Sequence, residues 1–185
     1  DVGHRGQPRQ GHRPGKTTEA EKAETLENLT LATSFDEAAR TAALVIEAVP
    51  ERMELKKTIF GALGELTLPS CILGTNTSSL SVDEIAQATA HPERVIGTHF
   101  FNPVHIVKLL EIVVPEGTNA ATLSNTRMFG ERMNREMITV KDSPGFATSR
   151  LGLALGLEAI RMVETGVASA EDIDRGMELG YRHPM

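Results

Sequence analysis

Short apolar runs alternate with longer segments of helical spacing along the middle of the chain. The runs predict strands at 43–47, 71–73, 95–99, 109–114 and 137–140, and the run at 43–47 is a candidate for a buried strand. Between them, apolar residues recur at the spacing of a helix face in 51–66, 81–90 and 119–133. Strands that alternate with helices of this length indicate crossover connections. We therefore predict an α/β fold with a mostly parallel sheet.

The pattern changes at both ends of the chain. Residues 1–14 are basic and show no periodicity, which predicts a disordered arm. Helical segments are expected from residue 15 and over 34–40, so that a first domain spans 15–142. After the Asp142-Ser-Pro-Gly145 turn, helices are expected at 147–164 and 169–180, as the start of an all-helical domain over 143–185. Two helices rarely form a stable domain alone, so we expect this segment to pack on a partner or to be part of a longer protein.

Composition and charge exclude several classes of protein. Of 185 residues, 40% are hydrophobic and 24% charged, the mixture of an ordinary globular protein. The net charge of −6 argues against nucleic acid as a main partner. A single cysteine, Cys71, cannot form an internal disulfide. The sequence has no apolar stretch of about 18 residues or more and no secretory leader, so we expect a cytoplasmic protein without a membrane partner.

Polar residues follow three of the predicted strands. Ligands of an open parallel sheet bind at the carboxyl ends of its strands, which meet along one edge. The residues that follow the strands at 43–47, 71–73 and 95–99 would bring Glu51, Asn76, Ser78, His99 and Asn102 to that edge. The sequence thus predicts a dense polar site on a largely apolar scaffold.

His99 is the main candidate for proton transfer. It ends a buried strand, where its surroundings can tune the pKa of the imidazole. Glu111 lies inside the apolar run LLEIVV, where a carboxylate is costly unless it has a partner. A His99–Glu111 pair across neighbouring strands would supply that partner. From the residues alone, a structural core histidine and an edge-strand glutamate explain the pattern equally well.

The other candidates have plain structural alternatives. Ser78 could donate a hydroxyl near a substrate oxygen, or serve only as loop and helix-cap chemistry. Asn102 precedes a proline and could be a turn residue, and Lys56 would ordinarily be a solvated surface lysine. The spacing of His99 and His105 and the isolation of Cys71 do not fit a zinc site, so no metal is expected.

Several motifs in order resemble the L-3-hydroxyacyl-CoA dehydrogenases, a group that includes the 3-hydroxybutyryl-CoA dehydrogenases. They are LVIEAVPE (44–51), TNTSSLSVDEIA (75–86), RVIGTHFFNPVHIVKLLEIV (94–113), VKDSPGF (140–146) and ASAEDIDRGMELGYRHPM (168–185). The resemblance runs from about Gly15 to the end of the chain. It implies a Rossmann-like, NAD-binding domain followed by a helical domain that forms a homodimer in the full-length protein.

The resemblance also implies roles in NAD-dependent oxidation of a 3-hydroxyacyl-CoA in fatty-acid metabolism. His99 would take the proton of the 3-hydroxyl while hydride passes to the nicotinamide, and Glu111 would orient the imidazole. Ser78 would hydrogen-bond the reacting oxygen. The residues expected at the cofactor are Glu51, Lys56, Asn76, Ser78 and Asn102.

Two departures from the family pattern stand out. No G-x-G-x-x-G motif follows an apolar run, so the first strands and the pyrophosphate-binding loop of the family are not in this sequence. The family usually has Asn-Arg two residues after SPGF, with the Asn holding substrate; here the pair is Ser149-Arg150, and Ser149 takes that substrate-binding position with a shorter side chain.

Two other functions fit the residues. A Ser78/His99/Glu111 hydrolase has the residue types of a triad, although Ser78 is not in a G-x-S-x-G turn. The chain could also be an inactive piece of a dehydrogenase that lacks the phosphate-binding loop. The sequence gives no acyl-chain length and does not tell a single-function enzyme from a fusion.

Overall fold

The computed structural model describes residues 18–183. The arm predicted at 1–14 and the first residues of the helix predicted from residue 15 lie outside the described residues. The contacts between residues divide the chain into two compact units, with the boundary between Phe35 and Asp36.

Among the described residues of the first unit, 18–35, lies helix α1 (Glu19–Glu27). Thr18 and Glu21 form a capping box at its start: the Thr18 hydroxyl accepts from the Glu21 amide at 3.2 Å, and the Glu21 carboxylate accepts from the Thr18 amide at 2.7 Å. No side chain of α1 is buried. The helix predicted here is confirmed, although it is shorter than its sequence pattern suggests.

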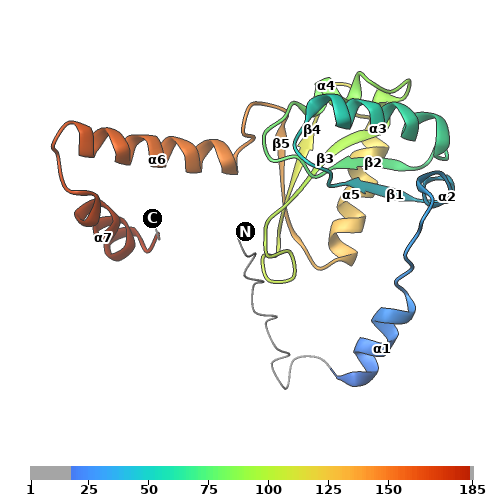
Figure 1. Cartoon of the computed structure of the whole chain (residues 1–185), viewed down its shortest axis with the longest axis horizontal. Coiled ribbons are helices and arrows are strands. Elements are labelled where there is room, and N and C mark those ends of the chain that lie inside the picture. The colour runs from blue at the N-terminus through green and yellow to red at the C-terminus, as the bar shows by residue number, and fades with distance from the viewer. Residues whose placement is uncertain (1–17, 184–185) are drawn as a thin grey trace, which may run out of the picture. The chain divides into compact units, whose positions relative to one another are not determined.

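The second unit is built on a five-stranded sheet in the order β1-β2-β3-β4-β5 (Figure 1). The strands are β1 (Leu44–Glu47), β2 (Ile72–Thr75), β3 (Val95–Phe100), β4 (Leu109–Val114) and β5 (Glu136–Lys141). All neighbouring strands are parallel except β3 and β4, which are antiparallel. The predicted α/β class and mostly parallel sheet are therefore confirmed.

Helices cover both faces of the sheet. They are α2 (Phe35–Arg40), α3 (Met53–Leu66), α4 (Val82–Ala86), the single 3₁₀ turn η1 (Pro92–Arg94) and α5 (Ala120–Arg132). The helix predicted over 81–90 ends at Ala86. There the backbone tightens into i→i−3 bonds, from Ala88 to Ile85 at 3.1 Å and from Thr89 to Ala86 at 3.3 Å.

The two faces have separate cores. Helices α3 and α4 lie on one face, where Phe60, Val82 and Ile85 pack with Val95 and Val113 (Figure 1). Helix α5 lies on the other face, against Ile96, Leu110 and Ile112. Because side chains alternate along a strand, His99 shares the α3/α4 face with Val95, and Glu111 shares it with Val113. The strand register thus places both candidate residues on one side of the sheet.

Gly97 of β3 is the register partner of Val113 of β4. A Cβ at this position would lie 2.6 Å from the Cβ of Val113 and 3.2 Å from a methyl group of Val82. The β-branched side chains of Val113 and Val82 cannot easily change rotamer to make room. We therefore expect Gly97→Ala to lower the free energy of unfolding by about 1–3 kcal/mol. Gly152→Ala is the matched control. It meets no atom within 4 Å in a helix, and we expect it to be neutral or stabilising by up to about 1 kcal/mol. Urea unfolding of the three proteins tests both expectations, and equal midpoints would contradict the packing argument.

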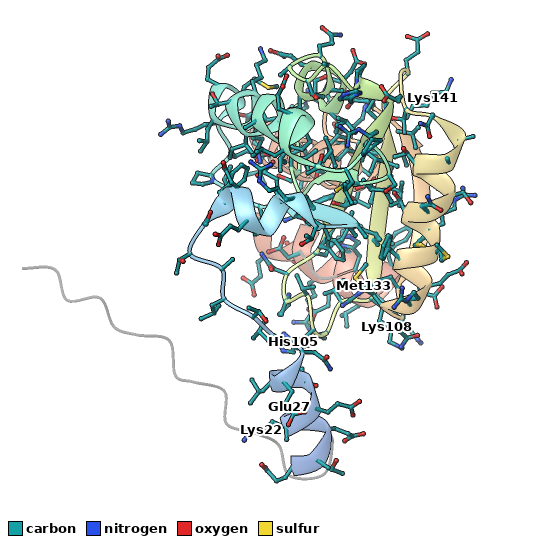
Figure 2. The ribbon with its side chains drawn as sticks, turned by 90° about the vertical axis from the view of Figure 1, so that its right-hand side faces the viewer. Lys22, Glu27, His105, Lys108, Met133 and Lys141 are labelled. Carbon is teal, nitrogen blue, oxygen red and sulfur yellow. The ribbon has the colours of Figure 1, made fainter. Side chains whose placement is uncertain are left out.

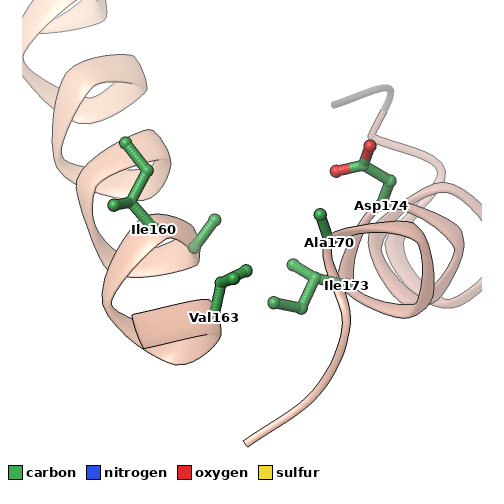
Figure 3. Close-up of a pocket in the computed structure, with 6 residues that line it drawn as sticks. Ile160, Val163, Ala170, Ile173 and Asp174 are labelled. Atoms are coloured by element: carbon green, nitrogen blue, oxygen red, sulfur yellow. The ribbon is translucent and has the colours of Figure 1, made fainter. Parts of the chain in front are cut away.

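Two helices follow the sheet: α6 (Thr148–Glu164) and α7 (Ala170–Tyr181). Both helices predicted in this region are confirmed. Ile160 and Val163 of α6 face Ala170 and Ile173 of α7 around a cavity of about 160 Å³ (Figure 3). Several large apolar side chains of this pair remain exposed, namely Leu151, Leu153, Leu157, Ile160, Val163 and Leu179. No helix between residues 18 and 183 has the length together with the apolar character that a membrane crossing demands.

Candidate active site

His99 and Glu111 face each other across the antiparallel pair β3–β4. They are register partners in the ladder, and the His99 Nδ1 lies 2.9 Å from the Glu111 Oε2. The side chain of Glu111 is completely buried and that of His99 is 8% exposed. Since β4 lies between β3 and β5, the alternative of an edge-strand glutamate is wrong. The structure joins the two residues as the sequence predicts.

The Glu111 carboxylate receives four hydrogen bonds. Oε1 accepts from the backbone amides of Ala147 and Thr148, at 2.9 and 3.2 Å. Oε2 accepts from the Thr148 hydroxyl at 2.8 Å as well as from His99. Burial alone acts to raise the pKa of Glu111, but the hydrogen bonds from His99, from Thr148 and from the Ala147 amide together hold it below its ordinary value. Glu111 is therefore an anion at neutral pH.

The lowered pKa of Glu111 predicts a contribution to acid sensitivity. A carboxyl whose folded-state pKa is lowered stabilises the fold above its unfolded-state pKa, and this stabilisation disappears as the pH falls through the folded value. We expect wild type to lose more unfolding free energy than Glu111→Gln between about pH 5 and about pH 3. Glu65→Gln, at an exposed position on α3, is the control and should follow wild type. Denaturant unfolding across this pH range measures the difference; parallel curves for wild type and Glu111→Gln would contradict it.

Aromatic rings enclose the imidazole of His99. The ring of Phe101 lies 4.3 Å from it between centroids, and the ring of Phe146 lies 5.8 Å away in an edge-on arrangement. Phe146 is buried and has a positive φ of 52°, directly after Gly145 at 73°. This left-handed turn brings the Phe146 ring into the α3/α4-face core and starts α6 beside Glu111.

Asp142 links the segment before this turn to the loop after β2. Its Oδ2 accepts from the Ser81 hydroxyl at 3.0 Å and from the Asp83 amide at 2.7 Å, at the start of α4. A carboxylate at a helix start satisfies amides that have no partner within the helix. Asp142 thereby connects residues 142–146 to the segment after β2, which contains Asn76 and Ser78.

Lys56 is buried, contrary to the surface lysine that its residue type suggests. Its side chain is 1% exposed, and its Nζ lies 2.8 Å from the Glu47 Oε1 and 3.2 Å from the Glu51 Oε2. Glu47 is equally buried and also accepts from the Thr75 hydroxyl at 2.8 Å and from the Val49 amide at 2.6 Å. The sequence analysis did not single out Glu47. The pairing of Glu47 with Lys56 could have been inferred from the helix spacing, because Lys56 lies on the same face of α3 as the buried Phe60 and Leu63.

Glu51 connects this buried pair to the loop that carries Ser78. Its Oε1 accepts from the Thr77 hydroxyl and, at 3.1 Å, from the Ser78 amide. Burial acts to raise the pKa of Glu51, but the hydrogen bonds from Thr77, Lys56 and Ser78 bring it below its ordinary value. The side chain of Glu51 is 37% exposed. An anchored carboxylate therefore reaches solvent at the carboxyl end of the sheet.

The remaining candidates lie around this end of the sheet in different settings. The Asn76 Oδ1 accepts from the Phe100 amide at 2.8 Å, which fastens the end of β2 to the end of β3. Ser78 and Asn102 are exposed, and Ser149 is half-buried in the first turn of α6. The Asn102–Pro103 peptide bond is cis.

Arg135 fixes the loop of residues 101–108 that carries Asn102. Its guanidinium donates to the carbonyls of Val104 and Val107, at 2.8 and 2.9 Å, and lies 5.8 Å from the centre of the Phe100 ring. Figure 2 shows His105 and Lys108 of this loop at the opposite end of the sheet from Lys141. This role of Arg135 could not be predicted from the sequence, because a lone arginine before a strand has no recognisable pattern.

Family models match nearly the whole chain. The NAD-binding domain of 3-hydroxyacyl-CoA dehydrogenase matches residues 5–143, and the C-terminal domain of 3-hydroxyacyl-CoA dehydrogenase matches residues 145–185. The two models follow each other along the chain without overlap.

Individual relatives agree with the family models. The 3-hydroxybutyryl-CoA dehydrogenase of Clostridioides difficile is 41% identical over 171 residues, which cover 92% of this chain and 60% of the relative. Human mitochondrial hydroxyacyl-coenzyme A dehydrogenase is 39% identical over 158 residues, or 84% of this chain and 50% of the relative. The crystal structure of (S)-3-hydroxybutyryl-CoA dehydrogenase PaaH1 from Ralstonia eutropha superposes with a TM-score of 0.85 at 37% identity, covering 91% of this chain and 59% of that one. The chain thus spans between half and three fifths of the length of these relatives.

Proposed function

The chain belongs to the 3-hydroxyacyl-CoA dehydrogenase family, and from this we propose that it acts in the NAD-dependent oxidation of the 3-hydroxyl of an (S)-3-hydroxyacyl-CoA to the 3-oxoacyl-CoA. The observation that carries the proposal is the 2.9 Å contact between the His99 Nδ1 and the Glu111 Oε2. In this proposal His99 is the base and Glu111 its orienting partner.

From the geometry of the pair we infer that Nε2 is the ring nitrogen that acts as the base. An ionised carboxylate only accepts hydrogen bonds, so the Nδ1 of His99 carries a proton and donates this hydrogen bond to Glu111 Oε2. The neutral imidazole then has its lone pair on Nε2, which takes the proton of the 3-hydroxyl as the C3–H bond breaks. The buried anion of Glu111 stabilises the imidazolium that forms.

The carboxyl ends of β1 to β3 fit the ribose and nicotinamide end of NAD. Glu51 offers a partly exposed carboxylate held in place by Thr77 and Lys56, the kind of acceptor that ribose hydroxyls require. We propose Glu51, Asn76, Ser78 and Asn102 as cofactor-binding residues, with Lys56 acting from behind Glu51. NAD supplies the hydride acceptor when it is bound. A G-x-G-x-x-G loop for its pyrophosphate is not part of this sequence.

Serine hydroxyls are the proposed contacts of the substrate. Ser78 is exposed at the loop anchored by Glu51, where its hydroxyl can donate to the reacting oxygen. Ser149 is the second residue of α6 and directly follows Thr148, whose hydroxyl donates to Glu111. The matches to dehydrogenase models over nearly the entire chain favour this role of Ser78 over that of a hydrolase nucleophile.

A homodimer through the helical segment is the proposed assembly. Leu151, Leu153, Leu157 and Ile160 of α6 are exposed, and exposed apolar patches mark surfaces that bind another protein. Sedimentation equilibrium measures the state directly, and a protein that stays monomeric at high concentration would contradict this part of the proposal.

An assay on the protein tests the activity. NADH formation is followed with (S)-3-hydroxybutyryl-CoA, and the (R)-isomer is the control substrate. Calorimetric titration with NADH measures cofactor binding independently of turnover. We expect heat of binding and turnover of the (S)-isomer alone. A protein that neither binds NADH nor oxidises the substrate would contradict the proposal and support a non-catalytic role.

A further inference from the structure

Thr148 is the first residue of α6, and its side chain contacts Glu111. Its hydroxyl donates a hydrogen bond at 2.8 Å to the Glu111 Oε2. The same oxygen accepts the hydrogen bond from the His99 Nδ1 at 2.9 Å. A carboxylate accepts only, so the direction of this hydrogen bond is fixed. The Thr148 hydroxyl and the His99 imidazole are therefore two donors that share the negative charge of the same oxygen, Glu111 Oε2.

The backbone holds the carboxylate whatever side chain stands at position 148. The amides of Ala147 and Thr148 both donate to the other oxygen, Oε1. Ala147, at the N-cap position, makes no side-chain cap, so Glu111 takes the place of one at the start of α6. A substitution of the Thr148 side chain therefore removes one donor from Oε2 and leaves Glu111 in position.

We propose that Thr148 is a positioning residue that sets the strength of the His99–Glu111 hydrogen bond. With its hydroxyl present, the negative charge on Oε2 is shared between two donors. Without it, that charge acts on the imidazole proton alone, and the Nδ1–H···Oε2 bond becomes stronger. Thr148 thereby moderates how tightly the carboxylate holds the base. This inference rests on the proposed function only in calling His99 the base.

The Nδ1 proton of His99 reports the strength of this bond directly. In the chain labelled with ¹⁵N-histidine, the proton resonance of a strongly hydrogen-bonded Nδ1–H lies far downfield. We expect Thr148→Val to move this resonance further downfield, by well more than its line width. Thr148→Ser retains a hydroxyl and should keep the wild-type position. Thr165→Val, at the C-cap of the same helix where the hydroxyl donates to the Arg161 carbonyl, is the matched control and should leave the resonance unchanged.

The outcomes separate this inference from the proposed function. A downfield resonance in wild type that is the same in a folded Thr148→Val variant overturns the role of Thr148 and leaves the catalytic pair intact. A wild-type protein without an Nδ1–H resonance of His99 that depends on Glu111 overturns the pair itself. Should the valine variant fail to fold, Thr148→Ala is compared with Thr148→Ser instead, because alanine is favourable in a helix. Coincident resonances in those two variants likewise overturn the inference.

Discussion

Replacing His99 by glutamine should lower the turnover number by about a hundredfold to ten-thousandfold, the contribution of a positioned general base. Glutamine can still occupy the space beside Phe101 and Phe146 and donate to Glu111, but it has no nitrogen that takes a proton at neutral pH. Steady-state kinetics with the (S)-3-hydroxyacyl-CoA, together with NADH titration, measure the effect. The dissociation constant of NADH should change little, because the base acts in the chemical step.

His105→Gln provides the control for this substitution. His105 is exposed in the 101–108 loop, six residues further along the chain, and the same chemical change there should leave turnover close to wild type. Equal losses in the two variants would point to a general effect of histidine removal. Unchanged turnover in His99→Gln would remove His99 from the mechanism.

Lys56→Met should give the largest loss of stability, of about 3–5 kcal/mol, because it leaves the Glu47 carboxylate buried without its charge partner. Methionine keeps most of the length and apolar volume of the lysine stem, so packing on the buried side of α3 changes little. The hydrogen bonds from Thr75 and Val49 remain but carry no full positive charge. Urea unfolding measures the loss, and a decrease in NADH affinity is expected with it because Glu51 also loses the Lys56 contact.

Two variants distinguish a buried charge pair from ordinary helix packing. Lys57→Met makes the same change at the next residue, where the ion pairs with Glu54 and Glu84 lie at the surface, and we expect little loss of stability. Glu47→Gln combined with Lys56→Met removes both charges and should recover part of the stability lost in Lys56→Met alone. A double variant no more stable than the single one would show that packing, not charge, dominates at this position.

The strands and helices of the second unit could be predicted because burial follows a simple period in this sequence. Strands β1 to β4 contain short apolar runs, and α3 carries an apolar stripe. The pattern is weaker at the far end of the sheet, where β5 is largely exposed and the buried residues of α5 are Thr122, Thr126 and Gly130. His99 and Glu111 could be predicted as a pair for a related reason: a carboxylate between Leu110 and Ile112 needs a donor, and the adjacent strand offered one. The cost of desolvating Glu111 thus favoured a pair with His99, although the residues alone left a structural histidine and an edge-strand glutamate equally open.

The remaining contacts depend on geometry that no local pattern carries. Nothing in Thr148-Ser149 tells which hydroxyl faces Glu111, because that depends on the first turn of α6 and on the positive φ of Phe146. The role of Arg135 depends on a loop that returns from β3 to within reach of its guanidinium. Lys56 shows a third case: residue type suggested the surface, whereas helix position placed it beside Glu47. Side-chain direction in loops and helix starts is set by tertiary contacts.

Because β3 and β4 are antiparallel neighbours, His99 and Glu111 form a pair that is local in the sequence. His99 and Glu111 are twelve positions apart, whereas most partners within the sheet are joined by longer crossover connections. Closing so short a loop costs little conformational entropy, and contacts of low sequence separation form early in folding. The hairpin should therefore assemble its histidine and glutamate before the parallel strands complete the sheet, as a nucleus around which the longer connections condense.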